Sequence, residues 1–390
     1  MKKKIIFVTK ALWIGGIETA LVNLLNNFNY KKYDVTLLVL KAELDMLKQI
    51  YPKCRVIIAD RDETVSFQEK YRYSRLYHLT EEPENPSWLH KIMMWTVPVI
   101  RWMENCFYIR YIRKMMRGEQ FDTAVIYSDV AGETTVRAIR ADKYLMFYHH
   151  GAMRHVYHDK IAYKKCEEII AVSENQAETL RQFIPQYKNK VIAIHNLTDV
   201  QGIRDKGIAK IAEVFDKTQF HIVSVGRVSH EKGMDIAVKV CSRLVEDGYK
   251  NVRWWIVGDG SAMEEVRRII TDLHMEEYVF TVGMKANPYP YIQQADLYVQ
   301  PSRFEGYPMT ILEALILGQV VISTDNPGAS EIIDNNHTGI LCPLDIKKFA
   351  VTIEKMIQKP QELEKIKKSV QQINFLKQNY ENINMLEKFL

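Results

Sequence analysis

Short runs of apolar residues alternate along the chain with longer amphipathic stretches. Uninterrupted apolar runs of this length are typical of parallel strands buried on both faces of a sheet. Strands that alternate with helical patterns predict a parallel sheet, and the alternation restarts near residue 200, which predicts two Rossmann-like α/β domains. The runs are residues 5–8, 35–40, 56–59, 124–127, 144–148, 169–172 and 191–194, then 222–225, 254–257, 279–282, 297–300 and 320–323.

The segment that follows the run at 297–300 carries two carboxylates at a strand-to-helix turn. Glu305 lies in a loop with Gly306 and Pro308, and Glu313 lies in an expected helix over residues 309–317. Proline suits the first helical turn, because its missing N–H has no partner to lose there. The free amides at such a helix start attract anions. Carboxylates for hydroxyls beside amides for phosphate suit a nucleotide-sugar, whereas the alternative is a well-capped core helix with two solvated acids.

Glycines and cations come directly after several of the predicted strands. The run at 222–225 leads into Gly226 and Arg227, and Lys232-Gly233 follows before the next helix. Gly15-Gly16 follows the first run, Gly258-Asp259-Gly260 follows a later one, and residues 301–306 read P-S-R-F-E-G. In this order and spacing, the chain resembles glycosyltransferase family 4. That resemblance implies retaining enzymes with the α/β GT-B fold, in which two Rossmann-like domains with parallel sheets face an interdomain cleft.

The resemblance also implies roles for individual residues. Arg227 and Lys232 would hold a diphosphate, Glu305 would hold hydroxyls of the donor sugar, and a histidine before Gly151 would lie near that sugar. His150 fits this pattern better than its neighbour His149, although which of the two faces the donor is open. The expected catalytic residues are Glu305, His150, Arg227 and Lys232, and the expected donor-binding residues are Gly15, Gly16, Gly226, Gly258, Met284, Gly306, Tyr307, Pro308, Met309, Thr310 and Glu313.

The expected activity is transfer of a hexose or N-acetylhexosamine from a nucleotide diphosphate sugar, with UDP favoured, to a hydroxyl of a glycan or lipid-linked acceptor in cell-surface polysaccharide synthesis. No cofactor or metal is expected, because two fixed cations and a helix N-terminus can stabilise the departing diphosphate. A UDP-sugar epimerase of the same fold and a non-catalytic nucleotide-sugar-binding subunit are the alternatives. The expected division is 1–197 for the acceptor-binding domain, 198–372 for the donor-binding domain, and 373–390 for a helix that crosses back.

Composition narrows the class of protein further. The chain has 390 residues, 47% of them apolar and 26% charged, with a net charge of +5, which indicates a folded protein with a mild preference for anionic partners and no sign of nucleic-acid binding. Its five cysteines show no metal-ligand spacing, which favours reduced thiols in a cytoplasm. Asp60-Arg61-Asp62 matches the metal signature of a different glycosyltransferase fold, and we interpret it as a solvated loop.

Residues 88–117 form the unusual part of the first half. Bulky apolar residues recur every seven positions at Trp88, Trp95, Trp102, Ile109 and Met116, and a basic face is formed by Arg110, Arg113, Lys114 and Arg117. The apolar run is far shorter than the about 20 residues that span a bilayer. Two interpretations are open. The helix lies peripherally on an anionic membrane surface, at the inner face of the plasma membrane, or it packs on its own sheet with a solvated cationic face.

Overall fold

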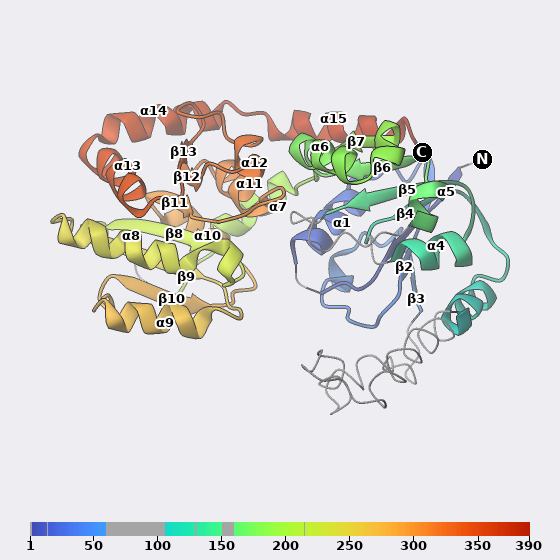
Figure 1. Cartoon of the computed structure of the whole chain (residues 1–390), viewed down its shortest axis with the longest axis horizontal. Helices are drawn as coiled ribbons and strands as arrows, with labels where there is room; N and C mark the ends of the chain where they lie inside the picture. The colour runs from blue at the N-terminus through green and yellow to red at the C-terminus, as the bar shows by residue number, and fades with distance from the viewer. Residues whose placement is uncertain (1, 14, 60–105, 129–130, 150–159, 214) are drawn as a thin grey trace, which may run out of the picture.

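The computed structural model describes residues 2–13, 15–59, 106–128, 131–149, 160–213 and 215–390. It contains two all-parallel sheets, each with helices on its faces, which lie side by side in the elongated molecule (Figure 1). The predicted α/β class with two Rossmann-like sheets is therefore confirmed.

The first sheet is formed by seven strands in the order β3-β2-β1-β4-β5-β6-β7. Each of the seven runs predicted in the first half corresponds to one of them. Its elements are β1 Lys3–Thr9, α1 Gly16–Asn26, β2 Tyr33–Val39, η1 Leu47–Gln49, β3 Arg55–Ile58, β4 Gln120–Ile126, α4 Gly132–Ala138, β5 Arg140–Tyr148, α5 Lys160–Lys165, β6 Glu168–Ala171, α6 Glu174–Phe183, η4 Pro185–Lys190 and β7 Val191–Ala193.

The second sheet is formed by six strands in the order β10-β9-β8-β11-β12-β13. The sequence pattern missed β13, because only three residues pair there and they do not form an extended apolar run. The elements are α7 Val200–Gly207, β8 Phe220–Val225, η5 His230–Lys232, α8 Met234–Glu246, β9 Val252–Val257, α9 Met263–Asp272, β10 Val279–Gly283, α10 Tyr289–Gln294, β11 Leu297–Gln300, α11 Met309–Ile316, β12 Val321–Thr324, α12 Pro327–Ser330, β13 Ile340–Cys342, α13 Ile346–Gln358, α14 Pro360–Gln371 and α15 Phe375–Glu387.

Burial on both faces explains why the strand sequences are uniformly apolar. Along β1, Ile5 and Phe7 belong to one hydrophobic cluster, whereas Ile6 and Val8 belong to the cluster on the opposite face. Successive side chains of a strand point to opposite faces, so a sheet covered on both sides needs apolar residues at every position.

The chain passes between the sheets through residues 195–199 and returns through α15. In Figure 1, α14 and α15 run along one edge of both halves, and the C-terminus lies close to the N-terminus. The Asn379 side chain of α15 accepts a hydrogen bond from Thr198 N–H at 3.2 Å and donates one to Thr198 O at 2.6 Å. Leu386 packs in a cluster of the first sheet, whereas Phe375 belongs to the cluster of the second. The helix α15 therefore packs against both halves, and the division at residues 197 and 372 stays a prediction.

The helix over residues 106–115 packs on the first sheet. Ile109, Ile112 and Met116 are buried in one of its hydrophobic clusters, so this end of the seven-residue stripe is core. Arg110 and Lys114 are exposed on the opposite side. The three tryptophans of the stripe, at 88, 95 and 102, lie outside the described residues, as do Asp60 and Asp62. Within the described part of the chain, no helix is long and apolar enough to cross a membrane.

Candidate functional site

The candidate site lies where the strand order of the second sheet reverses. The chain moves outward from β8 through β9 to β10 and then returns to place β11 on the other side of β8. In an open parallel sheet, ligands bind in the crevice beyond the carboxyl ends of the two strands at such a point. Gly226 and Arg227 follow β8, and Glu305 follows β11, so the fold brings these predicted residues to the crevice.

Lys232 and Glu305 form the central ion pair of this crevice. The Lys232 Nζ atom lies 2.8 Å from each Glu305 carboxylate oxygen. The Glu305 side chain is only 6% exposed, whereas that of Lys232 is 25% exposed. The ammonium group therefore keeps access to solvent, and it can meet an anionic ligand without leaving the carboxylate.

A chain of buried polar side chains orients Glu305. Tyr298 OH donates to Gln300 Oε1 at 2.6 Å, Gln300 Nε2 donates to Ser302 Oγ at 2.7 Å, and Ser302 Oγ donates to Glu305 Oε1 at 2.6 Å. Sequence reasoning did not assign a role to Tyr298, Gln300 or Ser302. A glutamine that ends an apolar strand was the available signal, because a buried polar group needs a partner.

The helix α11 begins as expected, one residue after Pro308, which occupies its N-cap position. Met309 is buried and Thr310 is half-buried in the first turn. Glu313, one turn further, is also buried, so the interpretation of the two acids as solvated is wrong. Burial raises the pKa of Glu313 to about 7, although a hydrogen bond from Tyr289 OH, 3.3 Å from Oε1, opposes this shift.

The glycines at the carboxyl ends of β8, β9 and β10 lie close together. Gly258 has φ +147°, and a Cβ atom there would lie 1.9 Å from Gly226 O. Its N–H donates to Gly283 O at 2.9 Å. Only glycine fits such a contact, which brings three loops to one rim of the crevice. Met284, next along this rim, is 68% exposed, so its side chain is available to a ligand.

The first turn of α1 carries the glycines that were predicted in the first half of the chain. Gly15 caps the N-terminus of α1 and Gly16 is its first residue. Glu18, in the same turn, is buried, and burial raises its pKa, whereas its own backbone, the Trp13 side chain and the charge of Arg227 act in the opposite direction. Glu18 was not among the predicted residues, although an acid two residues after a glycine pair is a visible signal.

The loop before α11 also contacts the first half of the chain. Ser173 Oγ donates to Gly306 O at 3.4 Å, and the Tyr307 ring stacks on His195 with ring centroids 5.0 Å apart. His195 Nε2 lies 2.6 Å from Glu331 Oε1, which also accepts the N–H of Glu174 at 2.6 Å. Gly306 and Tyr307 therefore lie at the contact between the two halves.

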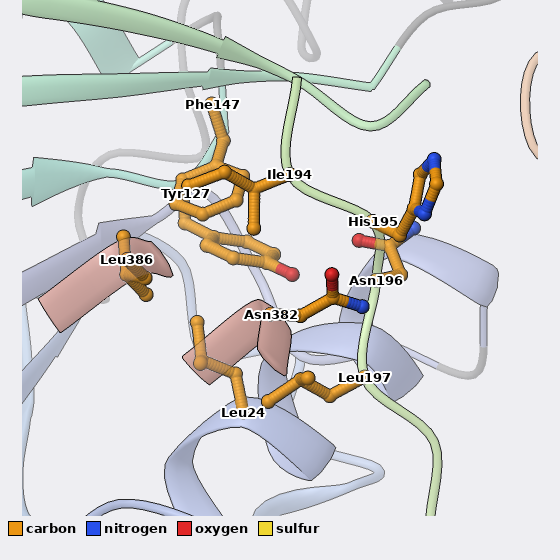
Figure 2. Close-up of a pocket in the computed structure, with 9 residues that line it drawn as sticks. All are labelled: Leu24, Tyr127, Phe147, Ile194, His195, Asn196, Leu197, Asn382 and Leu386. Atoms are coloured by element: carbon orange, nitrogen blue, oxygen red, sulfur yellow. The ribbon is translucent and has the colours of Figure 1, made fainter. Parts of the chain in front are cut away.

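The histidine pair is described only in part. His149 packs its ring on Tyr127, with centroids 4.6 Å apart, and on Phe147, with centroids 5.7 Å apart. Figure 2 shows Tyr127 and Phe147 gathered with the 194–197 segment and with Asn382 and Leu386 of α15. His149 is thus held by aromatic packing in the first half, whereas His150 lies outside the described residues.

The residues brought together here offer cations and amides to an anion and carboxylates to hydroxyl groups. A metal centre is not among them: the described ranges contain no cluster of three or more His, Cys, Asp or Glu side chains arranged to hold an ion. The arrangement suits a ligand that combines a phosphate with a polyhydroxylated part.

The two-sheet arrangement matches solved structures along nearly its whole length. HepE of Anabaena, in complex with UDP and glucose, superposes with a TM-score of 0.71 over 99% of this chain and 100% of that one, at 16% identity. TarM of Staphylococcus aureus, in a complex that contains UDP, superposes with a TM-score of 0.67 over 98% and 100%, at 12% identity. Both are GT-B glycosyltransferases, so the chain has the predicted GT-B fold.

The second half also matches a family model. Residues 205–373 match the model described as "Glycosyl transferases group 1". An uncharacterized glycosyltransferase of Methanocaldococcus jannaschii is 28% identical over 178 residues, which are 45% of this chain and 44% of that protein. A 4-alpha-N-acetylgalactosaminyltransferase of Campylobacter jejuni, whose name specifies a diphospho-undecaprenol-linked acceptor, is 29% identical over 186 residues, or 47% and 49%. The matched part spans less than half of these relatives.

Proposed function

We propose that this protein is a retaining glycosyltransferase of family 4 that transfers a hexose or N-acetylhexosamine from a UDP-sugar to a hydroxyl of a glycan or lipid-linked acceptor. The observation that carries the proposal is the Lys232–Glu305 pair at the strand-order reversal, beside Arg227 and the N-terminus of α11. The match of residues 205–373 to glycosyl transferases group 1 supports the same activity.

Arg227 and Lys232 neutralise the charge that develops on the diphosphate as the bond to the sugar breaks. The free amides at the start of α11 add partial positive charge at the same place. Charge-assisted hydrogen bonds of this kind contribute roughly 1.5–3 kcal/mol each. Since these groups already stabilise the leaving group, transfer proceeds without a metal ion.

Glu305 accepts hydrogen bonds from sugar hydroxyls, and Glu313 accepts them from the ribose. The bond between the anomeric carbon and the phosphate oxygen breaks, and the acceptor oxygen bonds to that carbon from the same face. The acceptor proton passes to the departing phosphate oxygen. Glu305 therefore positions the sugar and is not a nucleophile in this scheme.

The similar proteins support the donor and acceptor classes. HepE is described with UDP, with UDP and glucose, and with UDP-glucose. The Campylobacter relative acts on a lipid-linked diphosphate, and a Staphylococcus aureus relative is a poly(ribitol-phosphate) alpha-N-acetylglucosaminyltransferase. By extension, we propose that this chain acts in cell-surface polysaccharide synthesis. We place it in the cytoplasm, peripherally at the inner face of the membrane.

The test starts with a thermal-shift screen of UDP-, GDP- and ADP-sugars, because a ligand at 100 times its Kd adds about 2.7 kcal/mol of stability. The best donor is then incubated with lipid-linked and soluble glycan acceptors, with and without EDTA, and the anomeric configuration of the product is read by NMR. An α-linked product from an α-linked donor, made in EDTA, supports the proposal. An epimerised sugar without acceptor, or binding without turnover, overturns it in favour of an epimerase or a non-catalytic subunit.

Two variants connect that activity to the site. Lys232→Ala lowers kcat/KM by about thirty- to a thousandfold, equivalent to about 2–4 kcal/mol. Lys250→Ala, which removes an exposed lysine between α8 and β9, serves as the charge control and lowers kcat/KM by less than about threefold. Equal rates for the two variants would contradict the role of Lys232.

A further inference from the structure

Arg303 lies between Ser302 and Glu305 in sequence, yet its side chain turns away from them to a different segment. Its Nη1 atom lies 2.7 Å from Asp235 Oδ1, and its Nη2 atom lies 2.7 Å from Asp235 Oδ2. This is a two-point contact, in which a planar guanidinium fits both oxygens of a carboxylate. Asp235 is in the first turn of α8, three residues after Lys232.

The same arginine also contacts the turn that carries Lys232. Its Nη1 donates to His230 O at 2.7 Å, and its backbone N–H donates to Glu231 O at 2.7 Å. The segments 230–235 and 301–305 are therefore joined by Arg303 at three places. Lys232 and Glu305, which form the central ion pair, belong to one segment each.

The backbones of the two segments also touch. Gly233 has φ +67°, and a Cβ atom there would lie 2.0 Å from Pro301 O. This close approach brings the two backbones together at that point. It does not by itself set the direction of the Lys232 side chain, which depends on how the η5 turn is held.

Both side chains of this pair are largely shielded from solvent. The Asp235 side chain is 12% exposed and the Arg303 side chain 26%. Burial acts to raise the pKa of Asp235, but the hydrogen bonds and charge of Arg303, together with Lys239, lower it below the usual value. Asp235 is thus a carboxylate at neutral pH, and Arg303 is its main counter-ion.

We propose that Arg303 and Asp235 are a positioning pair, which holds the Lys232 ammonium against Glu305 in the arrangement that meets the donor diphosphate. The inference rests on the proposed function for its effect on turnover, but not for its effect on Lys232 itself. Arg303 bonds to Asp235 and to the turn, so it acts through Lys232 and not on the substrate.

Two variants test the pair with little change in side-chain volume. Arg303→Lys keeps the positive charge and loses the two-point contact, and Asp235→Asn keeps the shape and loses the negative charge. Asp247→Asn is the matched control, because Asp247 caps the other end of α8 and pairs with Arg243 at 2.6 Å. Thermal unfolding of all three shows that each is folded before the other measurements are made.

The first measurement needs no substrate. Trace acylation of the free protein with acetic anhydride, followed by mass spectrometry, reports how exposed and how deprotonated each lysine is. Arg303→Lys and Asp235→Asn raise the acylation rate of Lys232 by several-fold relative to exposed Lys217, because its ammonium leaves Glu305. Asp247→Asn leaves this ratio unchanged. An unchanged ratio in both test variants overturns the proposal.

The second measurement is kinetic. Both variants lower kcat more than they raise KM, by about ten- to a hundredfold in kcat. Each is then combined with Lys232→Ala, and the double variant is no slower than Lys232→Ala alone, because the pair acts through that lysine. Additive losses overturn the proposal in favour of a merely structural pair. If the wild type transfers no sugar while Lys232 acylation rises as expected, the proposed function fails and the positioning pair stands.

Discussion

Glu305 and Glu313 are both buried, but their charges are compensated to different extents. Glu305 has Lys232 at 2.8 Å and the Ser302 hydroxyl at 2.6 Å. Within the described structure, the hydrogen-bond partner of the Glu313 carboxylate is the Tyr289 hydroxyl, at 3.3 Å. A buried carboxylate without a close cation favours its neutral form, so burial raises the pKa of Glu313 to about 7.

Replacing Glu313 by Gln should stabilise the free protein at pH 8. The folded protein holds the Glu313 proton more tightly than the unfolded chain does, so its free energy of unfolding falls as pH rises from about 4.5 to about 7. The amide of the Glu313→Gln variant cannot ionise and avoids this penalty, which is on the order of 3 kcal/mol above pH 7. We expect a higher Tm for Glu313→Gln at pH 8 and nearly the same Tm as wild type at pH 4.5, measured by calorimetry.

Glu305→Gln is the control at the same temperatures and pH values. It removes the partner of a half-buried lysine, so it should lower the Tm at pH 8. If both variants shift the Tm in the same direction at pH 8, the difference in compensation between the two carboxylates is refuted.

At the scale of elements, the site depends on turns as much as on the helices and strands that they connect. The turn between β8 and α8 carries Arg227, Lys232 and Gly233 within seven residues. It lies against the loop between β11 and α11 because Gly233 has no side chain at the contact with Pro301. The shape of this turn therefore decides where both cations point.

Gly233→Ala tests this close contact. The new methyl group would meet Pro301 O at 2.0 Å and would also strain a backbone with φ +67°. Gly248→Ala is the control, because Gly248 has φ +100° with open space around its missing Cβ, so that only the backbone strain applies. We expect about 1–2 kcal/mol of destabilisation for Gly248→Ala with unchanged UDP affinity, and a larger loss for Gly233→Ala together with weaker UDP binding. Calorimetry with UDP decides, and equal UDP affinities would contradict the role of this turn.

We predict that the exposed basic face of the 106–115 helix binds anionic membranes. Arg113 donates from Nε to Arg137 O at 2.8 Å, so it has a structural role and should not be changed. Changing Arg110, Lys114 and Arg117 to Gln should strongly reduce sedimentation with anionic vesicles, because each basic residue near such a surface contributes about 1 kcal/mol. Gln at Lys365, Lys368 and Lys377 removes the same charge from α14 and α15 as a control. Normal vesicle binding by the first triple variant, or none by the wild type, would mean that this face is merely solvated.

At the scale of the whole molecule, few polar contacts join the two halves within the described ranges, and they concentrate near the crossing segments. Thr198 pairs with Asn379 of α15, and Glu331 reaches His195 and the N-terminus of α6. Tyr307, in the loop before α11, stacks on the same His195. The relative placement of the halves therefore depends on contacts that are adjacent to the site.

Asn379→Ala should destabilise both halves together. It leaves the buried N–H and C=O of Thr198 without the side chain that they bond, and each such group costs roughly 1–3 kcal/mol. Exposed Gln378→Ala, on the same helix, should change the Tm by less than about 1 °C. Calorimetry that shows equal Tm values for the two variants would contradict the importance of this contact.

Much of the fold follows from local pattern. Twelve of the strands coincide with apolar runs, because strands buried on both faces must be apolar throughout. The start of α11 follows from Pro308, and the Gly258 turn from the need for a residue without Cβ. β13 was missed because three paired residues carry too little periodicity, and the stripe at Ile109 and Met116 looked the same whether it faced a membrane or a core.

The chemistry of the site required the tertiary structure. Lys232 and Glu305 are 73 residues apart in the sequence. Only the reversal of strand order makes β8 and β11 neighbours, and this lets the two side chains form an ion pair. The high pKa of Glu313 arises because packing of distant segments buries its carboxylate, a shift that the hydroxyl of Tyr289 from α10 only partly opposes. The contact of Arg303 with Asp235 arises because two loops pack at a glycine. A sequence shows which residues can ionise or donate, since that depends on the side chain alone. The partners and the burial of these side chains depend on how distant segments pack. Partners and burial together decide whether a side chain is charged and where it points.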